Sequence, residues 1–390
     1  TFFAVMFFGW NKVSKKFHLA STWLTCIGAS ISALWILVAN AWMQHPVGME
    51  FNPDTVRNEM VDFWAVALNP VAVSKFFHSV LSGWMTGSIF VIGVSSWYLL
   101  KKREVRFALA SIKVAAVVGI FGTLAVMFTG DSSAIHVSKY QPMKLAAAEG
   151  LENGGRRAPF SIVPGIEIPG MLSILATHDL DGYVPGINDI LSGYTDNDGN
   201  KVLSADEKRE RGVLALNAFK AYRENKDTNP EAAAEARKVL DENVEYFGYG
   251  YIKDKNDLVP PVWLVYWPFR IMVGLGSFLL LLMFVVLWAE WKGKMEKLTW
   301  LQWTAIFSIP LVYLAGQAGW IVAEVGRQPW AIQDLLPVNA AVSSLSTGAV
   351  KTTFFVFIAV FTLFLAIEIR ILLKAIKKGP AVDEPGESNI

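Results

Sequence analysis

The sequence predicts an all-α protein, a polytopic bundle of membrane-spanning helices with one long extramembrane loop. Of its 390 residues, 53% are hydrophobic, and the mean hydropathy is +0.37, which is more apolar than soluble domains usually are. Six runs also reach the ~20 apolar residues that a bilayer-spanning helix needs: 17–44, 76–100, 107–130, 259–289, 298–323 and 352–367. Residues 1–10 are apolar too and lack the basic region of a signal peptide, so we expect a truncated seventh helix there.

Basic residues predict how these helices are oriented. The net charge is only +1, but Lys and Arg gather in four short segments at 12–16, 101–106, 292–297 and 370–378. Short basic loops stay on the cytoplasmic side of a membrane, and alternation then places 45–70, 131–257 and 325–348 outside. The predicted domains are transmembrane helices at 1–130, an extracytoplasmic loop domain at 131–257, transmembrane helices at 258–378 and a disordered tail at 379–390.

The long outer segment has two predicted surface helices, 206–224 and 231–245, where apolar residues recur at helical spacing among many charges. Pro-Gly pairs such as Pro164-Gly165 predict loops elsewhere, and we expect a partly ordered cap on the membrane face. Within it, residues 196–207 place oxygen donors as an EF-hand loop does. Gly199 stands too early, however, and Lys201 occupies the position that needs glycine, so a polar turn is favoured over a calcium site.

Several function classes find no support in the sequence. The basic segments are short and tied to helix ends, without the interleaved aromatic residues of a nucleic-acid interface. Cys26 is the single cysteine, so neither an internal disulfide nor a thiolate cluster is possible. His45, His136 and His178 show no spacing typical of a zinc site. We find no phosphate-binding glycine loop and no nucleophile elbow.

Ionisable groups within a membrane are costly, and they are therefore candidates for function. His78 and Met272 both fall in the outer halves of their helices, and an imidazole with a thioether suits a low-spin, electron-transferring haem iron. The alternatives are a hydrogen-bonded histidine and a methionine that fills the core. For His18, Lys75, Lys113 and Glu368, which lie near helix ends, snorkelling or pairing is a sufficient explanation.

Glu324 and Arg327 lie one turn apart at the outer end of their helix, where Gly326 and Pro329 end it. One interpretation is a helix-end ion pair; the other is a carboxylate ligand for a high-spin iron, with Arg327 beside a haem propionate. Arg270 stands two residues before Met272, near the outer interface. Snorkelling to lipid headgroups is its simplest explanation, and a clamp on a propionate is the alternative.

Four stretches carry a resemblance to a known family: Ser32–Met43, Lys75–His78, Phe269–Met272 and Gly319–Trp330. Across nearly all of its membrane part the chain resembles subunit I of the cytochrome bd-type quinol oxidases. The resemblance implies that His78 and Met272 are the axial ligands of a low-spin haem b, with Arg270 beside it, and that Glu324 binds a high-spin haem b. It also implies that Trp320 and Arg327 line the haems, and that Ser32 and Asn40 belong to a proton route.

The outer segment resembles the quinol-binding loop of that family, in which Gln141, Lys144 and Glu149 match the quinol-linked pattern. A carboxylate such as Glu149 would accept protons that quinol releases; a solvated loop charge is the alternative. The family carries a third haem, d or b, whose histidine ligand would stand upstream of Thr1. We therefore expect the chain to be N-terminally incomplete.

The resemblance and the topology together predict a bacterial cytoplasmic-membrane enzyme that oxidises quinol outside and reduces O2 to water. Its protons for water would come from inside, which builds a proton motive force without pumping. We expect a second large subunit, small single-helix subunits and membrane lipid as partners, and no nucleic acid. The rival hypotheses are a haem-free transporter with a His/Arg/Glu path and a non-catalytic haem-binding scaffold.

Overall fold

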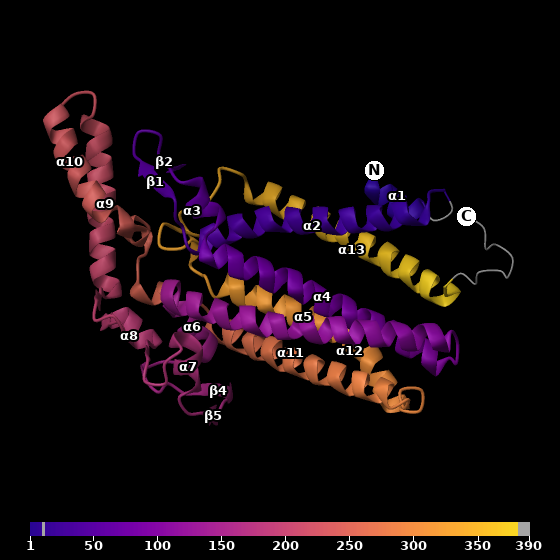
Figure 1. Ribbon diagram of the computed structural model, residues 1–390. Coiled ribbons are helices and arrows are strands. Elements are labelled where there is room, and N and C mark those ends of the chain that lie inside the picture. The colour runs from indigo at the N-terminus through magenta and orange to yellow at the C-terminus, as the bar shows by residue number, and fades with distance from the viewer. Residues whose placement is uncertain (10–11, 381–390) are drawn as a thin grey trace.

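The computed structural model describes residues 1–9 and 12–380. Within these residues, six segments are long and apolar enough to cross a membrane, and the predicted fold class is confirmed (Figure 1). Their long helices are α2 (Lys15–Gln44), α4 (Pro70–Leu100), α5 (Val105–Tyr140), α11 (Val262–Trp291), α12 (Thr299–Val325) and α13 (Thr347–Lys378). Each predicted apolar run falls on one of them.

Helix α5 continues to Tyr140, whereas the sequence predicts its end near residue 130. Its outer turns are polar but find partners: His136 Nδ1 lies 2.9 Å from Ser74 Oγ of α4, and Asp131 pairs with His178 at 3.0 Å. Satisfied polar side chains allow the helix to extend beyond the apolar run. The helix thus runs ten residues past the end of its predicted apolar run.

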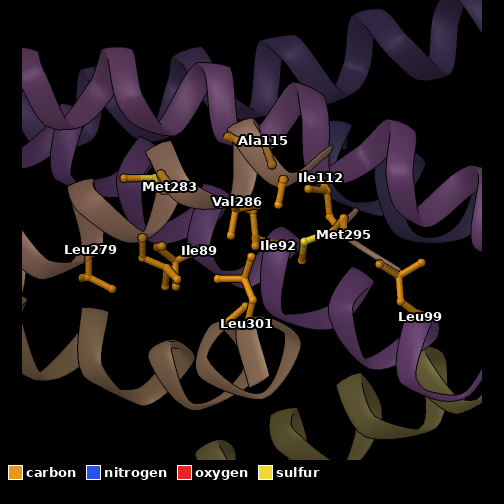
Figure 2. Packing of buried hydrophobic residues seen from close by; sticks show 14 of the residues in the cluster. Ile89, Ile92, Leu99, Ile112, Ala115, Leu279, Met283, Val286, Met295 and Leu301 are labelled. Atoms are coloured by element: carbon orange, nitrogen blue, oxygen red, sulfur yellow. The ribbon is translucent and has the colours of Figure 1, made fainter. Parts of the chain in front are cut away.

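Four of these helices form a closed ring in which α4 contacts α5 and α12, and α11 contacts α5 and α12. Helices α4 and α11 are thus diagonal partners across the bundle. The core is aliphatic, with Ile89, Ile112, Leu279 and Leu301 almost fully buried (Figure 2). Gly119 permits the close approach of helices, because a Cβ at this position would lie 2.3 Å from Met283 Sδ.

The remaining helices lie beside this ring. The short helix α1 (Phe2–Phe8), in the run predicted to be a truncated helix, packs on α2, and α2 packs on α4. Helix α13 is joined to the ring at its C-terminal end, where Tyr98 donates to the Ile376 carbonyl at 2.8 Å, and its apolar sides are exposed. The basic segments share one end of the bundle, opposite the segment 141–258, as the predicted orientation requires (Figure 1). We call the end with 141–258 the outer end.

The outer region is more regular than the sequence indicates. The predicted surface helices are confirmed as α9 (Ala205–Asn225) and α10 (Pro230–Asn243). Short helices are α3 (Phe63–Ala67), α6 (Pro142–Glu149), α7 (Met171–Thr177), α8 (Ile187–Ser192), η1 (Val244–Tyr251) and η2 (Lys255–Leu258). Antiparallel pairs are β1 (Met49–Asn52) with β2 (Arg57–Met60), β3 (Gly155–Arg156) with β6 (Tyr183–Val184), β4 (Phe160–Val163) with β5 (Ile166–Ile168), β7 (Tyr194–Thr195) with β8 (Lys201–Val202), and β9 (Trp330–Ile332) with β10 (Leu336–Pro337).

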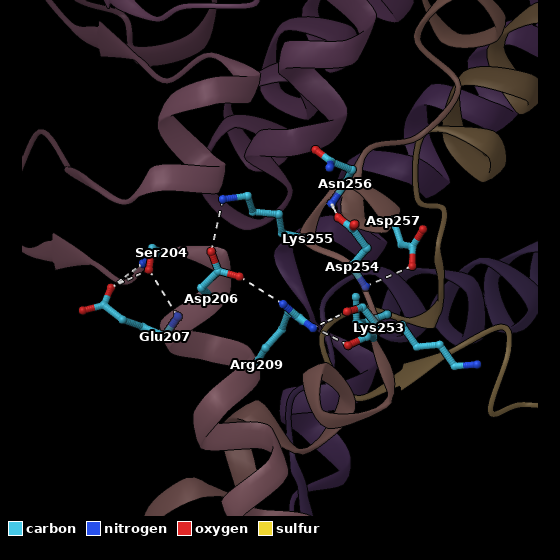
Figure 3. Close-up of polar contacts among 10 residues, drawn as sticks. Ser204, Asp206, Glu207, Arg209, Lys253, Asp254, Lys255, Asn256 and Asp257 are labelled. Carbon is cyan, nitrogen blue, oxygen red and sulfur yellow. Dashed lines mark hydrogen bonds and ion pairs between the residues drawn. The ribbon is translucent and has the colours of Figure 1, made fainter.

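Residues 196–200 of the EF-hand-like segment form the turn between β7 and β8, and the rest of the segment continues through β8 into α9. Asp196 Oδ1 accepts from the backbone N–H groups of Asp198 and Asn200, and Gly199 takes a φ of +84°. The two acidic residues after the hairpin serve α9: Glu207 forms a capping box with Ser204, and Asp206 bonds Arg209 and Lys255 (Figure 3). These contacts fasten α9 to η2. Of the predicted disordered tail, 381–390 lies outside the described residues.

Candidate functional site

Helix α6 places two buried charges at the outer end of the bundle. Lys144 and Glu149 are 3% and 5% exposed. They stand five residues apart, which on an α-helix is roughly 140° around the axis. Lys144 consequently faces α2, and Glu149 faces α11. The sequence places both residues on a quinol-binding loop, and the structure puts them in two separate polar clusters.

Glu149 forms a buried ion pair with Arg270 of α11. Arg270 Nη2 lies 3.0 Å from Glu149 Oε2 and donates to the Ser161 carbonyl at 2.8 Å. Arg270 Nη1 donates to the Ala148 carbonyl, and the guanidinium lies 3.5 Å from the Tyr266 ring centre. The prediction that Arg270 snorkels to lipid headgroups is wrong, because its guanidinium is buried and finds its acceptors on Ala148, Glu149 and Ser161. Glu149 is buried as well, so the alternative of a solvated loop charge is also wrong.

The environment of Glu149 sets its protonation near neutral pH. Burial raises the pKa of the Glu149 carboxyl to about 7, although the Arg270 charge and hydrogen bond act in the opposite direction. Desolvation disfavours the charged form, and here it outweighs the ion pair. A carboxylate of this kind can hold or release a proton at physiological pH.

Lys144 is surrounded by amides. Its Nζ donates to Gln141 Oε1 at 2.7 Å and to Gln44 Oε1 at 2.9 Å, and Gln141 donates to Gln333 Oε1 at 3.0 Å. Burial lowers the pKa of Lys144 well below its ordinary value. Within the described residues no carboxylate forms an ion pair with Lys144. When the amine is protonated, a third N–H remains for a ligand.

Glu324 has both carboxylate oxygens engaged. Asn40 Nδ2 donates to Oε1 at 2.9 Å, and Arg327 Nη2 donates to Oε2 at 2.7 Å. Asn40 Oδ1 in turn accepts from Lys75 Nζ at 2.6 Å and from Gln44 Nε2 at 3.2 Å. The helix-end ion pair predicted as one alternative is present. A carboxylate has about four lone-pair sites, so capacity for a metal ion remains.

A cavity of about 80 Å³ joins the outer face of this cluster. It is lined by Gln141, Lys144, Arg327 and Gln333, and on its far side by Lys208, Trp330 and other residues of the outer region. A smaller cavity of about 30 Å³ lies between Gln44, Lys75, Gln141 and the outer turns of α5. Both spaces touch the amides around Lys144.

His78 and Met272 lie on the diagonal helices α4 and α11. Counted at 1.5 Å per residue, they stand roughly 12 Å and 15 Å from the outer ends of their helices. His78 Nδ1 is 3.2 Å from Thr129 Oγ1, whose hydroxyl is placed to donate to the Ala125 carbonyl at 3.0 Å. The threonine oxygen then accepts from Nδ1–H, which leaves the lone pair on Nε2. Gly319 makes room for Met272, because a Cβ there would lie 2.9 Å from the sulfur.

Besides His78 and Met272, two predicted site residues make no contact with the polar clusters of Glu149, Lys144 and Glu324. Trp320 is 44% exposed on α12, and Ser32 is exposed on α2, two turns from Asn40. Gln44, Lys75 and Thr129 join the site although the sequence analysis did not assign them to it. An amide in the last turn of an apolar run, as at Gln44, is a signal that sequence reasoning missed. Of the two explanations given for Lys75, snorkelling or pairing, pairing fits, because its Nζ donates to Asn40 Oδ1 at 2.6 Å.

Comparisons with known proteins identify the family to which this chain is similar. Residues 1–380 match the family described as cytochrome bd terminal oxidase subunit I. The chain is 38% identical to cytochrome bd-II ubiquinol oxidase subunit 1 of Escherichia coli, over 98% of this chain and 77% of that protein. It is 33% identical to cytochrome bd ubiquinol oxidase subunit 1 of Bacillus subtilis, over 98% of this chain and 72% of that protein.

A solved structure shows the same fold. The bd oxidase from Geobacillus thermodenitrificans superposes with a TM-score of 0.72 at 22% identity, covering 97% of this chain and 74% of that one. The names of the relatives describe one numbered subunit of an oxidase that has others. With the family match spanning nearly all described residues, the chain belongs to the cytochrome bd terminal oxidase subunit I family.

Proposed function

We propose that this chain is the quinol-oxidising, haem-carrying subunit of a bd-type terminal oxidase. The observation that carries the proposal is α6, which holds a buried carboxylate with a pKa of about 7 and a buried lysine at the outer end of the helices that present His78 and Met272. Quinol oxidation releases two protons and two electrons together. The outer end of the bundle supplies a proton acceptor beside a candidate electron acceptor site.

Glu149 is the proposed acceptor of a quinol proton. A general base works best when its pKa lies near the operating pH, and Glu149 meets this condition. Arg270 stabilises the ionised carboxylate at 3.0 Å before the proton arrives. Lys144, with Gln141 fixing its ammonium at 2.7 Å, would donate a hydrogen bond to a quinol oxygen. Glu149, Lys144 and Gln141 would hold the headgroup, and Glu149 would take its proton.

The residues fit the haems that the family implies. The Thr129 contact keeps His78 in the tautomer that presents Nε2 to a metal. Buried Arg270 Nε, Arg327 Nε and Arg327 Nη1 have no hydrogen-bond partner within the described residues. Arg327 contacts the Glu324 carboxylate directly, and Lys75 and Lys144 reach it through Asn40 and Gln44. The unsatisfied arginine donors suit the carboxylates of haem propionates.

We therefore propose that His78 and Met272 hold the iron of a low-spin haem b and that Glu324 holds that of a high-spin haem b. A bound haem supplies one-electron redox chemistry, and a His/Met pair raises its potential. Arg270 and Arg327 would orient propionates, and Trp320 would cover an edge of the haem group. No residue is assigned to a third haem, of d or b type.

The wider proposal follows the orientation of the chain. Protons from quinol would leave at the outer end, while protons for the reduction of O2 to water would arrive from the basic end through Asn40 and Ser32. This separation builds a proton motive force without a pump. We place the protein in the bacterial cytoplasmic membrane, with a second large subunit and small subunits as partners. The Asn40 bond to Glu324 supports the route at 2.9 Å.

The decisive experiment is a reduced-minus-oxidised optical spectrum of the purified complex. Wild-type protein should show low-spin and high-spin haem b bands. His78→Ala should remove the low-spin band, and Glu324→Ala should alter the high-spin band. The control is His178→Ala, because His178 lies on the outer surface and pairs with Asp131. A spectrum without haem, or a low-spin band unaffected by His78→Ala, would refute the proposal.

Family membership argues against the haem-free transporter that the sequence left open. A haem-binding scaffold without catalysis would show the same spectrum but no quinol-dependent oxygen uptake. Oxygen consumption with ubiquinol-1 therefore separates it from the oxidase. Glu149→Gln should lose at least about a hundredfold in this rate, the lower range for general base catalysis, while keeping both haem bands.

A further inference from the structure

A continuous chain of hydrogen bonds joins the two halves of the site. It runs from Lys144 to Gln44 (2.9 Å), from Gln44 to Asn40 (3.2 Å) and from Asn40 to Glu324 (2.9 Å). Gln44 is 2% exposed and stands in the last turn of α2. Each end of this chain belongs to a residue with a proposed role, but Gln44 itself has none. Its side chain is the single direct link between Lys144 and Asn40 in the described residues.

We propose that Gln44 is a positioning residue that couples occupation of the quinol site to the hydrogen bonding of the Glu324 carboxylate. The inference rests on the proposed function of Lys144 and Glu324 and deepens it. Gln44 uses both ends of its amide: the oxygen accepts from Lys144, and the nitrogen donates to Asn40 Oδ1. A side chain with only donors or only acceptors cannot make both contacts.

Gln44 helps to fix the orientation of the Asn40 amide by donating to its oxygen. Asn40 Oδ1 receives two donors, Lys75 Nζ and Gln44 Nε2, and this arrangement directs Nδ2 toward Glu324. A flipped amide would put an oxygen against the carboxylate and lose the 2.9 Å bond. Buried hydrogen-bonded networks polarise one another, and an unpaired member is costly. A quinone that draws the Lys144 ammonium away from Gln44 therefore changes the donors around Glu324.

The test uses the complete oxidase complex in the oxidised state and the short-tail quinone ubiquinone-1 as the probe. The optical and electron paramagnetic resonance signals of the high-spin haem are recorded during a ubiquinone-1 titration. We expect wild type to show a saturable change in the high-spin signal. Gln44→Leu should lose this change while its haem content stays at the wild-type level and its ubiquinone-1 affinity falls no more than tenfold.

Two further variants make the result specific. Gln302→Leu is the matched control, because Gln302 is a buried amide (1% exposed) that bonds the Met295 carbonyl at 2.7 Å near the inner end of the bundle. It should keep the quinone-induced change. Gln44→Glu keeps an acceptor for Lys144 but loses the donor to Asn40. It should shift the high-spin signal even without quinone, and it serves as the test if Gln44→Leu does not fold.

The outcomes separate this inference from the proposed function. If ubiquinone-1 binds wild type without any change in the high-spin signal, or if Gln44→Leu responds as wild type does, the coupling is overturned while the oxidase function stands. A complex without haem, or one whose high-spin signal ignores Glu324→Ala, would instead overturn the proposed function. Equal responses of Gln44→Leu and Gln302→Leu would also refute a specific role for Gln44.

Discussion

The ion pair between Arg270 and Glu149 should set the acid limit of quinol oxidation. Wild-type kcat/KM is expected to fall about tenfold per pH unit below pH 7, because Glu149, with a pKa of about 7, becomes protonated and can no longer accept a proton. Arg270→Gln removes the cation at 3.0 Å. The pKa of Glu149 then rises further, since burial remains and the ion pair is gone.

The size of this shift follows from the contact that is lost. A hydrogen bond to a charged group contributes about 1.5–3 kcal/mol, which corresponds to about one to two pH units. Half of the wild-type carboxyl is ionised at pH 7, so at this pH the variant should be about 5–50-fold slower, and it should recover as the pH rises toward 9. The buried carboxylate takes up a proton rather than remaining unpaired, so the fold survives the substitution.

Oxygen uptake with ubiquinol-1 between pH 5.5 and 9, corrected for spontaneous quinol oxidation, measures the effect. Arg270→Lys should shift the acid limb less, because an ammonium keeps the charge but not the planar donor set. Arg209→Gln is the control: this arginine bonds Asp206 at 3.0 Å in the outer region, away from α6. An acid limb that stays at the wild-type position in Arg270→Gln, with haem content unchanged, would refute the reasoning.

Two further predictions concern stability. The pKa of Glu149 is about 7 in the folded protein, above its ordinary value of 4.5. Between pH 4.5 and 7 the folded protein therefore binds a proton that the unfolded protein has released. The free energy of unfolding declines as the pH rises through this window, by up to about 3 kcal/mol. Glu149→Gln should flatten the fall of the thermal unfolding midpoint between pH 5 and 7.5; an unchanged slope would contradict the assignment. Gly119→Ala should destabilise the bundle by about 1–3 kcal/mol, because its Cβ would lie 2.3 Å from Met283 Sδ. Gly83→Ala, with no atom within 4 Å, should leave the midpoint of thermal unfolding nearly unchanged, and equal effects of the two would count against tight packing.

The membrane helices could be predicted from sequence because one property, continuous apolar length, decides them. Helix ends were harder: α5 reaches Tyr140 since Ser74 and His178 from other elements satisfy its polar outer turns. No local pattern shows such partners. The small outer hairpins were also missed, because strands of two to four residues depend on their neighbours more than on their own propensity.

The chemical types of the site residues and the family resemblance were enough to predict these residues from the sequence. The sequence did not predict which side chains they contact. The sequence indicates that Arg270 is a cation near an interface, and only the fold shows that Glu149, 121 residues earlier, lies against it. Gln44 carries no signal in the sequence, and Lys75 is explained there without its partner. Their role emerges when α2 and α4 bring both to the oxygen of Asn40.

The separation of Lys144 and Glu149 by roughly 140° around α6 has a chemical consequence for the proposed oxidation. Glu149 faces Arg270, two residues from Met272, and Lys144 faces the amides that lead to Glu324. A quinol headgroup bound at α6 would thus give its proton on the side of the low-spin ligands and be sensed on the side of the high-spin ligand. One short helix, buried on both of its polar faces, would in this way connect the proposed site of electron entry with the proposed high-spin haem, without any contact between Lys144 and Glu149.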